Sequence, residues 1–314
     1  MEIKVIYHCY GGSHSSVTAA GIHLGLLPRD RTASARELLQ IPHFDTFEEI
    51  VHGHFRYAGR NLFNSAVYVL GKKTLGRRVS LLLKRLAEIS GCGDRVYPVD
   101  TTGPINPLMV LGGFLSRRLR LVGIGRPLVI LGTRLAYRKL SELVDRVEKA
   151  LREKQETETS TFNPRRMVFY ICPNVYRLAL PVAGFHLNPD FSKEAVLKWA
   201  IEQKFTGEVG EISLVGHDGG YDVYLVGAGA EPEIVARILR EYGGLIGIPR
   251  SSWFVVEAPA AGDIPYFLLA KIFKLFHLGK GLYFCERRAF RNLLDFYRRE
   301  AYRIKMCLKE GILD

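Results

Sequence analysis

Short apolar segments alternate with amphipathic segments along the first half of the chain. Four apolar segments have the length and composition of buried strands, namely KVIYHC (4–9), SAVYVLG (65–71), RVYPVD (95–100) and PLVILGT (127–133). Helical spacing of apolar residues follows each of them, at 15–27, 75–90, 107–119 and 134–152. Strands that alternate with helices predict crossover connections and a parallel sheet with helices on both faces.

The second half of the chain repeats this order. Residues 5–24 align without a gap to residues 168–187, and the identical positions are Val5, Tyr7, Cys9, Ala20, Gly21, His23 and Leu24, opposite Val168, Tyr170, Cys172, Ala183, Gly184, His186 and Leu187. Later segments also correspond, namely 65–71 with 221–227, 95–100 with 253–258 and 127–134 with 281–288. We therefore expect two tandem Rossmann-like three-layer α/β sandwiches, each with about four mainly parallel strands, that form a pseudo-dimer within one chain.

A polar stretch separates the two copies. Residues 153–166, EKQETETSTFNPRR, contain few apolar side chains and include Pro164, which is typical of a linker. The expected domains are thus 1–152, which carries a glycine-containing loop, and 167–314. Residues 48–59 and 211–220 precede the second strand of each copy and could add a hairpin at the sheet edge.

Composition indicates a folded protein of the cytoplasm. Apolar residues make up 47% and charged residues 24% of the 314 positions, which is typical of soluble globular domains. The five cysteines have no CxxC spacing, so neither a disulfide framework nor a zinc ribbon is expected, and no cofactor is predicted. The N-terminus lacks a signal sequence, and no apolar run reaches the roughly 18 residues of a membrane span.

The stretch HCYGGSHSS (8–16) links the first expected strand to the first expected helix and carries the candidate binding chemistry. Ligands of open α/β sheets bind beyond the carboxyl ends of the strands. Glycines allow a close approach of the backbone, serines add hydroxyl donors, and a helix N-terminus favours an anion. We predict that an anionic, phosphate-bearing small molecule binds here, and that the contacts are Gly11, Gly12, Ser13, His14, Ser15, Ser16 and the more distant His54. Ordinary helix capping by the same residues is the structural alternative.

Cys9, His14 and Asp100 are the candidates for catalysis. A helix N-terminus lowers the pKa of a nearby thiol and would favour the reactive thiolate of Cys9. Cys9 recurs as Cys172 beside a loop without glycines, however, which favours a small buried residue instead. His14 could act as an acid or base because imidazole titrates near neutral pH. Asp100 ends a strand at the same edge, where it could either join the site or cap the next turn.

The remaining histidines have a structural interpretation. His8, His43 and His52 lie near His14 and His54 in the sequence, but no two of them have a recognised metal-ligand spacing, and no metal site is predicted. His23 and His186 occupy matching positions inside helical segments. We expect these two histidines to make hydrogen bonds within the core.

The stretch HCYGGSHSSVTAAGIHLGLLP (8–28) resembles the opening of an uncharacterised bacterial family, the "domain of unknown function 3189" group. Its members are short proteins, mostly from spore-forming bacteria, and the family has no established activity. The second copy resembles it only through the repeat. A weaker resemblance, carried by KVIYHCYGGSHSSVTAA (4–20), is to the loop of low-molecular-weight tyrosine phosphatases and arsenate reductases. Their C-x5-R-S pattern places Ser15 at the arginine position and Ser16 at the serine position, and the Asp-Pro dipeptide of that family is missing.

Charge is concentrated in one part of the chain. The net charge is +12, and residues 51–150 contain 18 Lys and Arg against 6 Asp and Glu. Such a region is typical of proteins with an anionic partner.

Three functions stay open: binding of an anionic small ligand at the loop, a Cys9-dependent phosphatase-like or transferase-like enzyme, and a regulatory or interaction scaffold with a basic surface around Arg117 and Arg118. Nucleic acid would be a partner of the scaffold, although the chain lacks a nucleic-acid-binding motif.

Overall fold

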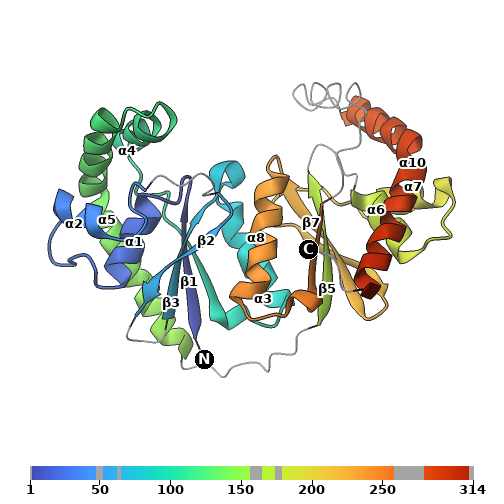
Figure 1. Cartoon of the computed structure of the whole chain (residues 1–314), viewed down its shortest axis with the longest axis horizontal. Coiled ribbons are helices and arrows are strands. Elements are labelled where there is room, and N and C mark those ends of the chain that lie inside the picture. The colour runs from blue at the N-terminus through green and yellow to red at the C-terminus, as the bar shows by residue number, and fades with distance from the viewer. Residues whose placement is uncertain are drawn as a thin grey trace. The chain divides into compact units, whose positions relative to one another are not determined.

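The first sheet has the strand order β2-β3-β1-β4 in the computed structural model (Figure 1). β1 (Ile3–Cys9) is central and runs parallel to β3 (Ser65–Gly71) and β4 (Val96–Asp100). β2 (Phe55–Arg60) pairs antiparallel with β3 at the edge. The sheet is therefore mainly parallel, and its antiparallel strand, β2, forms the expected hairpin with β3 at the sheet edge.

The structure describes residues 2–46, 52–61, 65–155, 165–173, 179–257 and 279–310, without the side chains of Asp94, 154–155 and 279–293. The chain divides into two compact units, Met1–Phe162 and Asn163–Asp314.

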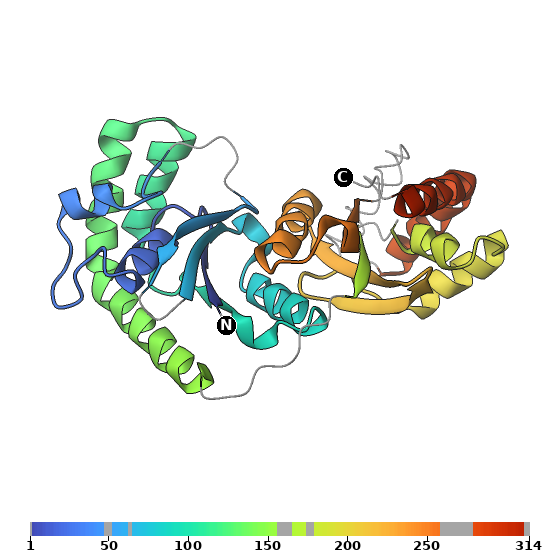
Figure 2. The ribbon, with the colours of Figure 1, turned by 60° about the horizontal axis from the view of Figure 1, so that its bottom comes forward.

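Helices cover both faces of the first sheet. α1 (Ser15–His23), α2 (Ala35–Gln40) and the long α5 (Val122–Gln155) share one hydrophobic core with the strands (Figure 2). α3 (Arg78–Ile89) packs against β4 through its buried side chains, Val79, Leu82, Leu83, Leu86 and Ala87. α4 (Pro107–Gly113) continues into a π-helical turn, Phe114–Arg118, and packs against α5 beyond the carboxyl ends of the strands.

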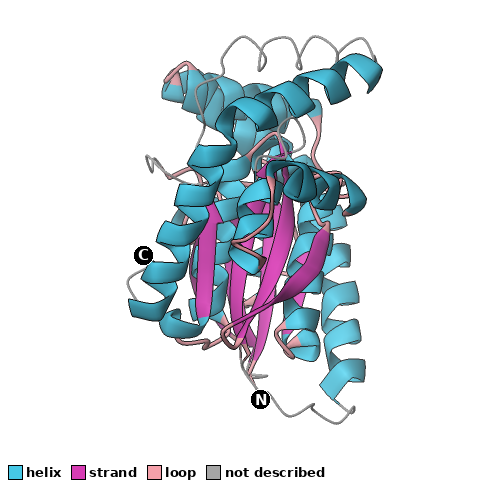
Figure 3. Ribbon diagram, turned by 90° about the vertical axis from the view of Figure 1, so that its right-hand side faces the viewer, coloured by secondary structure: helices cyan, strands magenta, loops and turns pink. Residues whose placement is uncertain are grey.

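The second unit has the same topology. β5 (Arg166–Pro173) lies between β7 (Tyr221–Gly229) and β8 (Trp253–Glu257), both parallel to it, and β6 (Ile212–Asp218) pairs antiparallel with β7. The strands run between layers of helices (Figure 3). α6 (Ala179–Leu187), α7 (Lys193–Glu202) and α10 (Gly279–Glu310) share a core with one face, and α8 (Pro232–Leu245) packs against β8 and β5. Two α/β units, each with a four-stranded mainly parallel sheet, confirm the expected fold class.

One expected strand in each copy is wrong. Residues 127–133 lie inside helix α5, and residues 281–288 lie inside helix α10. The buried side chains Val129, Thr133, Ala136 and Leu140 recur every three to four residues, which is the period of a helix. The fourth strand of each sheet is the edge strand instead, β2 or β6.

The junction between the copies is shorter than the sequence suggests. α5 continues to Gln155 and β5 begins at Arg166, so both ends of the expected linker 153–166 belong to regular elements. Residues 156–164 lie outside the described residues.

A buried tyrosine–histidine pair occurs at the same place in each unit. The Tyr7 hydroxyl lies 2.8 Å from Nδ1 of His23, and the Tyr170 hydroxyl lies 2.5 Å from Nδ1 of His186. Burial lowers the pKa of each histidine to about 4, so both rings are neutral at pH 7. The expectation that these histidines make hydrogen bonds in the core is confirmed.

Candidate functional site

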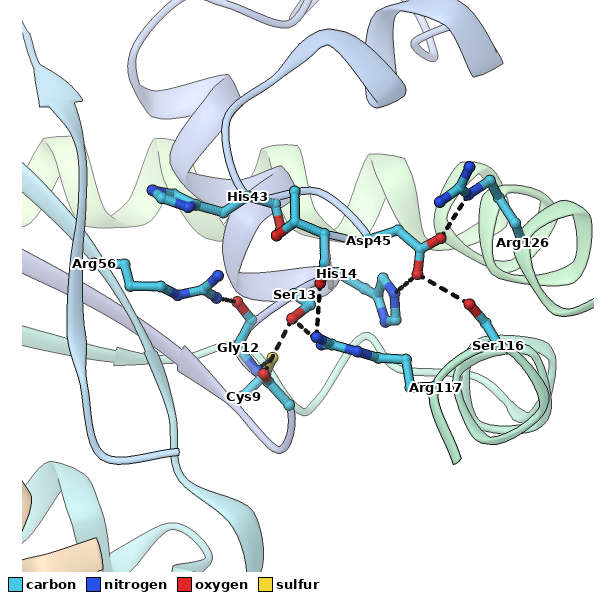
Figure 4. A network of polar contacts seen from close by, with 12 residues as sticks. Cys9, Gly12, Ser13, His14, His43, Asp45, Arg56, Ser116, Arg117 and Arg126 are labelled. Carbon is cyan, nitrogen blue, oxygen red and sulfur yellow. Dashed lines mark hydrogen bonds and ion pairs between the residues drawn. The ribbon is translucent and has the colours of Figure 1, made fainter. Parts of the chain in front are cut away.

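The loop that follows β1 lies at the carboxyl edge of the first sheet. β1 ends at Cys9, β3 ends at Gly71 and β4 ends at Asp100, and parallel strands bring these three ends to one edge. The loop is fixed to that edge through its backbone, because the amide of Lys72 donates to the carbonyl of Cys9 at 2.9 Å. Figure 4 shows the side chains that surround the loop.

The first side chain of the loop, Cys9, is buried in a ring of donors. The amide of Gly12 donates to Sγ at 3.1 Å, and the hydroxyl of Ser16 lies 3.2 Å from Sγ. Burial raises the pKa of Cys9, but the hydrogen bonds from Ser16, Ser15 and Gly12 outweigh it, so the pKa lies below its ordinary value. The donors of this loop therefore converge on the sulfur at its base, and they favour the thiolate.

The three loop serines all turn toward the protein. Ser13, Ser15 and Ser16 are each buried. The Ser15 hydroxyl lies 3.0 Å from the Thr101 hydroxyl, while the Ser13 hydroxyl donates to the carbonyl of Gly11 at 3.1 Å. These hydroxyls stabilise the loop conformation from inside, so a ligand above the loop would meet its backbone and its neighbours instead.

Two arginines from distant elements reach the loop. Arg56, on β2, donates to the carbonyl of Gly12. Arg117, in the π-helical turn after α4, donates through Nη1 to the Ser13 hydroxyl and through Nη2 to the carbonyl of Thr46 at 2.8 Å (Figure 4). The sequence places Arg117 in a basic stretch and gives no signal for Arg56, because only the fold brings either one to the loop.

His14 begins a second set of contacts centred on a buried carboxylate. Its Nε2 lies 3.1 Å from Oδ1 of Asp45, and Arg126 donates to Oδ2 of Asp45 at 2.7 Å. Ser116 donates to Oδ1 at 3.3 Å. Burial raises the pKa of Asp45, but the contacts with His14 and Arg126 outweigh it and hold the pKa below its usual value. Asp45 thus connects His14 to the π-helical turn that carries Ser116 and Arg117 and to the start of α5.

Asp100 belongs to a neighbouring ion cluster. Its Oδ1 lies 2.8 Å from Nζ of the buried Lys72 and accepts from the amide of Thr102 at 2.9 Å. Burial raises the pKa of Asp100, but Lys72 and Thr102 outweigh it and lower the pKa, so the side chain is a carboxylate at pH 7. The carboxylate caps its turn and also forms an ion pair.

His8 lies beside this cluster, which no sequence motif indicates. Its Nδ1 is 4.0 Å from Oδ1 of Asp100, and its Nε2 is 2.7 Å from the Ser80 hydroxyl. Burial, together with Lys72, lowers the pKa of His8 to about 3. β1 is buried along nearly its whole length, so the sequence signal for this cluster is only that His8, Lys72 and Asp100 stand at or just beyond the ends of three strands.

The other histidines are dispersed. His54 is half-buried and immediately precedes β2, at the same edge as the loop. His52 forms a bridge with Gly71, and Nε2 of His43 lies 3.0 Å from the carbonyl of Tyr57. Among the described residues, no three His, Cys, Asp or Glu side chains gather closely enough to hold a metal ion.

The described part of the second unit lacks the ion cluster of the first. Ile171 and Ala228 occupy the positions of His8 and Lys72. Glu257 lies opposite Ile171 as Asp100 lies opposite His8, one residue away from the sequence alignment of 95–100 with 253–258, and it pairs with Arg240 at 2.5 Å. Cys172 is buried at the end of β5, as Cys9 is at the end of β1. The rest of its loop, 174–178, lies outside the described residues.

Comparison with known proteins identifies the first unit only. No curated protein and no solved structure matches the chain. Residues 4–149 match the model of a family described as "Protein of unknown function (DUF3189)". This range of the chain contains the HCYGGSHSS loop and all the residues of the first site. Residues 4–149, within the first unit, are therefore similar to the DUF3189 family.

Proposed function

We propose that the first unit binds an anionic, phosphate-bearing small molecule above the loop Tyr10–Ser13, and that Arg117 is its main cationic contact. The position of Arg117 is the observation that carries this proposal. Its guanidinium donates to Ser13, and a Cβ added to Gly11 would lie 3.8 Å from its Nη1. A guanidinium presents a planar fork of N–H donors that matches the oxygens of a phosphate group.

The backbone around the loop supports the same ligand class. Helix α1 begins at Ser15, and no acidic residue occupies its first turn to compete for the N-terminal amides. Lys73 follows β3 and donates its amide to the carbonyl of Tyr10 at 2.9 Å, so a second basic residue borders the loop. Tyr10 itself is 54% exposed, which leaves an aromatic ring at the rim for an organic part of the ligand.

Replacement of Arg117 tests the proposal. We expect Arg117→Ala to weaken binding of inorganic phosphate or a nucleotide about tenfold or more, because a charge-assisted hydrogen bond contributes about 1.5–3 kcal/mol. Isothermal titration calorimetry measures the affinity. Arg118→Ala is the matched control, since it removes the same charge from an exposed neighbour. If both variants bound the ligand equally weakly, the effect would come from net charge and not from the position of Arg117. A wild-type chain that bound neither phosphate nor a nucleotide would refute the proposal.

A second candidate function is Cys9-dependent catalysis, and the lowered pKa of Cys9 favours it. Ser16 lies against Sγ and occupies the serine position of the C-x5-R-S pattern. In such a reaction the thiolate would attack phosphorus, an S–P bond would form, and the ester P–O bond would break to release an alkoxide that takes a proton. Water would then attack phosphorus and break the S–P bond, which releases phosphate and restores the thiolate. His14, held by Asp45, is the candidate donor, because Asp100 is already ionised at pH 7.

Hydrolysis of p-nitrophenyl phosphate distinguishes this candidate from simple binding. If Cys9 is the nucleophile, Cys9→Ser should abolish turnover while phosphate affinity changes little. Cys92→Ser is the control, because Cys92 is also buried and burial raises its pKa. Turnover that survives in Cys9→Ser would exclude Cys9 as the nucleophile, and binding without any turnover would leave the first function alone.

We also propose that the two units arose by duplication and that the second unit has a structural role. The shared strand order and the matching Tyr7–His23 and Tyr170–His186 pairs support a common origin. The replacement of His8 and Lys72 by Ile171 and Ala228 supports a loss of polar function in the second unit.

A further inference from the structure

The helical hairpin formed by α4, the π-helical turn and the start of α5 is packed through small residues. A Cβ added to Gly112 would lie 2.6 Å from the amide nitrogen of Val129, and one added to Gly132 would lie 2.7 Å from the amide nitrogen of Met109. Glycine therefore allows the two helix backbones to approach closely. With the inner faces filled in this way, the larger apolar side chains of the hairpin are left on its outer face.

That outer face is apolar and exposed to solvent. The large side chains at least 46% exposed on the hairpin are Val110, Leu111, Phe114, Leu119, Leu121, Ile124, Leu131 and Leu135. Within α5, Ile124, Leu131 and Leu135 are spaced seven and four residues apart, so they form one stripe. A helix that is apolar on its outer as well as its inner face normally has a second partner.

The charge of the hairpin is of one sign. No Asp or Glu occurs from Thr101 to Ser141, whereas the cations there are Arg117, Arg118, Arg120, Arg126, Arg134, Arg138 and Lys139. Arg118 and Arg120 are exposed at the tip, beside Leu119 and Leu121. Exposed apolar residues interspersed with arginine are the composition of segments that lie in the interface of an anionic bilayer.

We infer that this hairpin docks on the surface of an anionic lipid bilayer, with its apolar stripe in the interface and the exposed Arg118 and Arg120 among the headgroups. A second copy of the chain fits less well, because face-to-face association would bring two acid-free cationic surfaces together. The hairpin lies on the membrane surface and does not cross it, since no helix in the described part of the chain is long and apolar enough to span a bilayer.

Co-sedimentation of the full chain with lipid vesicles tests this inference. We expect binding to vesicles of phosphatidylcholine mixed with phosphatidylglycerol, little binding to phosphatidylcholine alone, and weaker binding as salt rises. Ile124→Asp and Leu135→Asp should each weaken vesicle binding about tenfold or more, because burial of one such side chain contributes about 1.5–3 kcal/mol. Leu81→Asp, at a position 43% exposed on α3, is the matched control and should bind as the wild type does.

Three outcomes would overturn the inference. The first is absence of vesicle binding, and the second is equal binding to both kinds of vesicle. The third is self-association, measured by sedimentation velocity without lipid and abolished by Ile124→Asp, because it would show that a second copy covers the stripe. Vesicle binding is assigned to the apolar stripe with Arg118 and Arg120, and phosphate binding to Arg117, so failure of one proposal leaves the other intact.

Discussion

Gly12→Ala should unfold the first unit at a lower temperature than any other glycine substitution in the loop. Gly12 has a φ of +67°, a region that side chains with a Cβ rarely occupy, and an added Cβ would lie 2.6 Å from the amide nitrogen of Gly71. Since that contact is with backbone, the loop or strand β3 must move. We expect a loss of about 3 kcal/mol, or a decrease of about 6–12 °C in the melting temperature of this unit.

Gly25→Ala separates the two causes of this loss. Gly25 has a φ of +70°, but an added Cβ there would meet nothing within 4 Å. This variant should show only the conformational cost, about 1 kcal/mol. Differential scanning calorimetry of the full chain measures both. Equal decreases in the two variants would mean that the contact between Gly12 and Gly71 adds nothing to the stability of the loop.

The Gly12→Ala substitution should also change the ionisation of Cys9. The amide of Gly12 donates to Sγ of Cys9, and its carbonyl accepts from Arg56. A displaced loop weakens both contacts, so the thiolate absorbance of Cys9 should appear at a higher pH than in the wild type. The fold and the site thus depend on the same backbone conformation.

Most of the fold follows from local patterns, and the exception is informative. The apolar strands around Cys9, Gly71 and Asp100 are buried between two helical layers, so their composition indicates their structure. Residues 127–133 resemble a strand in sequence because their apolar residues lie on two faces of α5: Val129 is buried, whereas Leu131 is 46% exposed. An apolar residue on a solvent-facing helix surface makes a helix resemble a buried strand. The error therefore came from the outer face that we assign to membrane docking.

The site could be predicted only where it is local in sequence. HCYGGSHSS holds the cysteine and its donors within nine residues, so the pattern alone located the loop. Arg117 lies about a hundred residues further along the chain and reaches Ser13 only because α4 packs on α5 beyond the sheet edge. Asp45 likewise follows a short irregular segment with no motif. Such contacts depend on tertiary packing, which a single sequence does not reveal.

Asp45→Asn should strongly destabilise the first unit. The Asp45 side chain is 1% exposed and has contacts with His14, Ser116 and Arg126. The amide is neutral, so His14 and Arg126 both lose a charged partner, and only one of its two terminal atoms can still accept a hydrogen bond. Because Arg126 is 42% exposed and can rehydrate, we expect a loss of about 2–3 kcal/mol, below that of a fully buried pair.

The pH dependence of this loss identifies its cause. The folded-state pKa of Asp45 lies below its ordinary value of 3.8, so its stabilising contribution is fully present above pH 3.8 and is lost as the pH falls through the folded-state pKa. The difference in unfolding free energy between wild type and Asp45→Asn, measured by urea titration, should therefore be large at pH 7 and shrink in acid below pH 3.8.

Asp145→Asn is the control, because the Asp145 side chain is 61% exposed and lies 3.5 Å from Arg29. This variant should change the unfolding free energy by less than about 1 kcal/mol. A difference for Asp45→Asn that stayed constant into acid would show that the loss comes from altered packing and not from the charge that joins His14 to the hairpin.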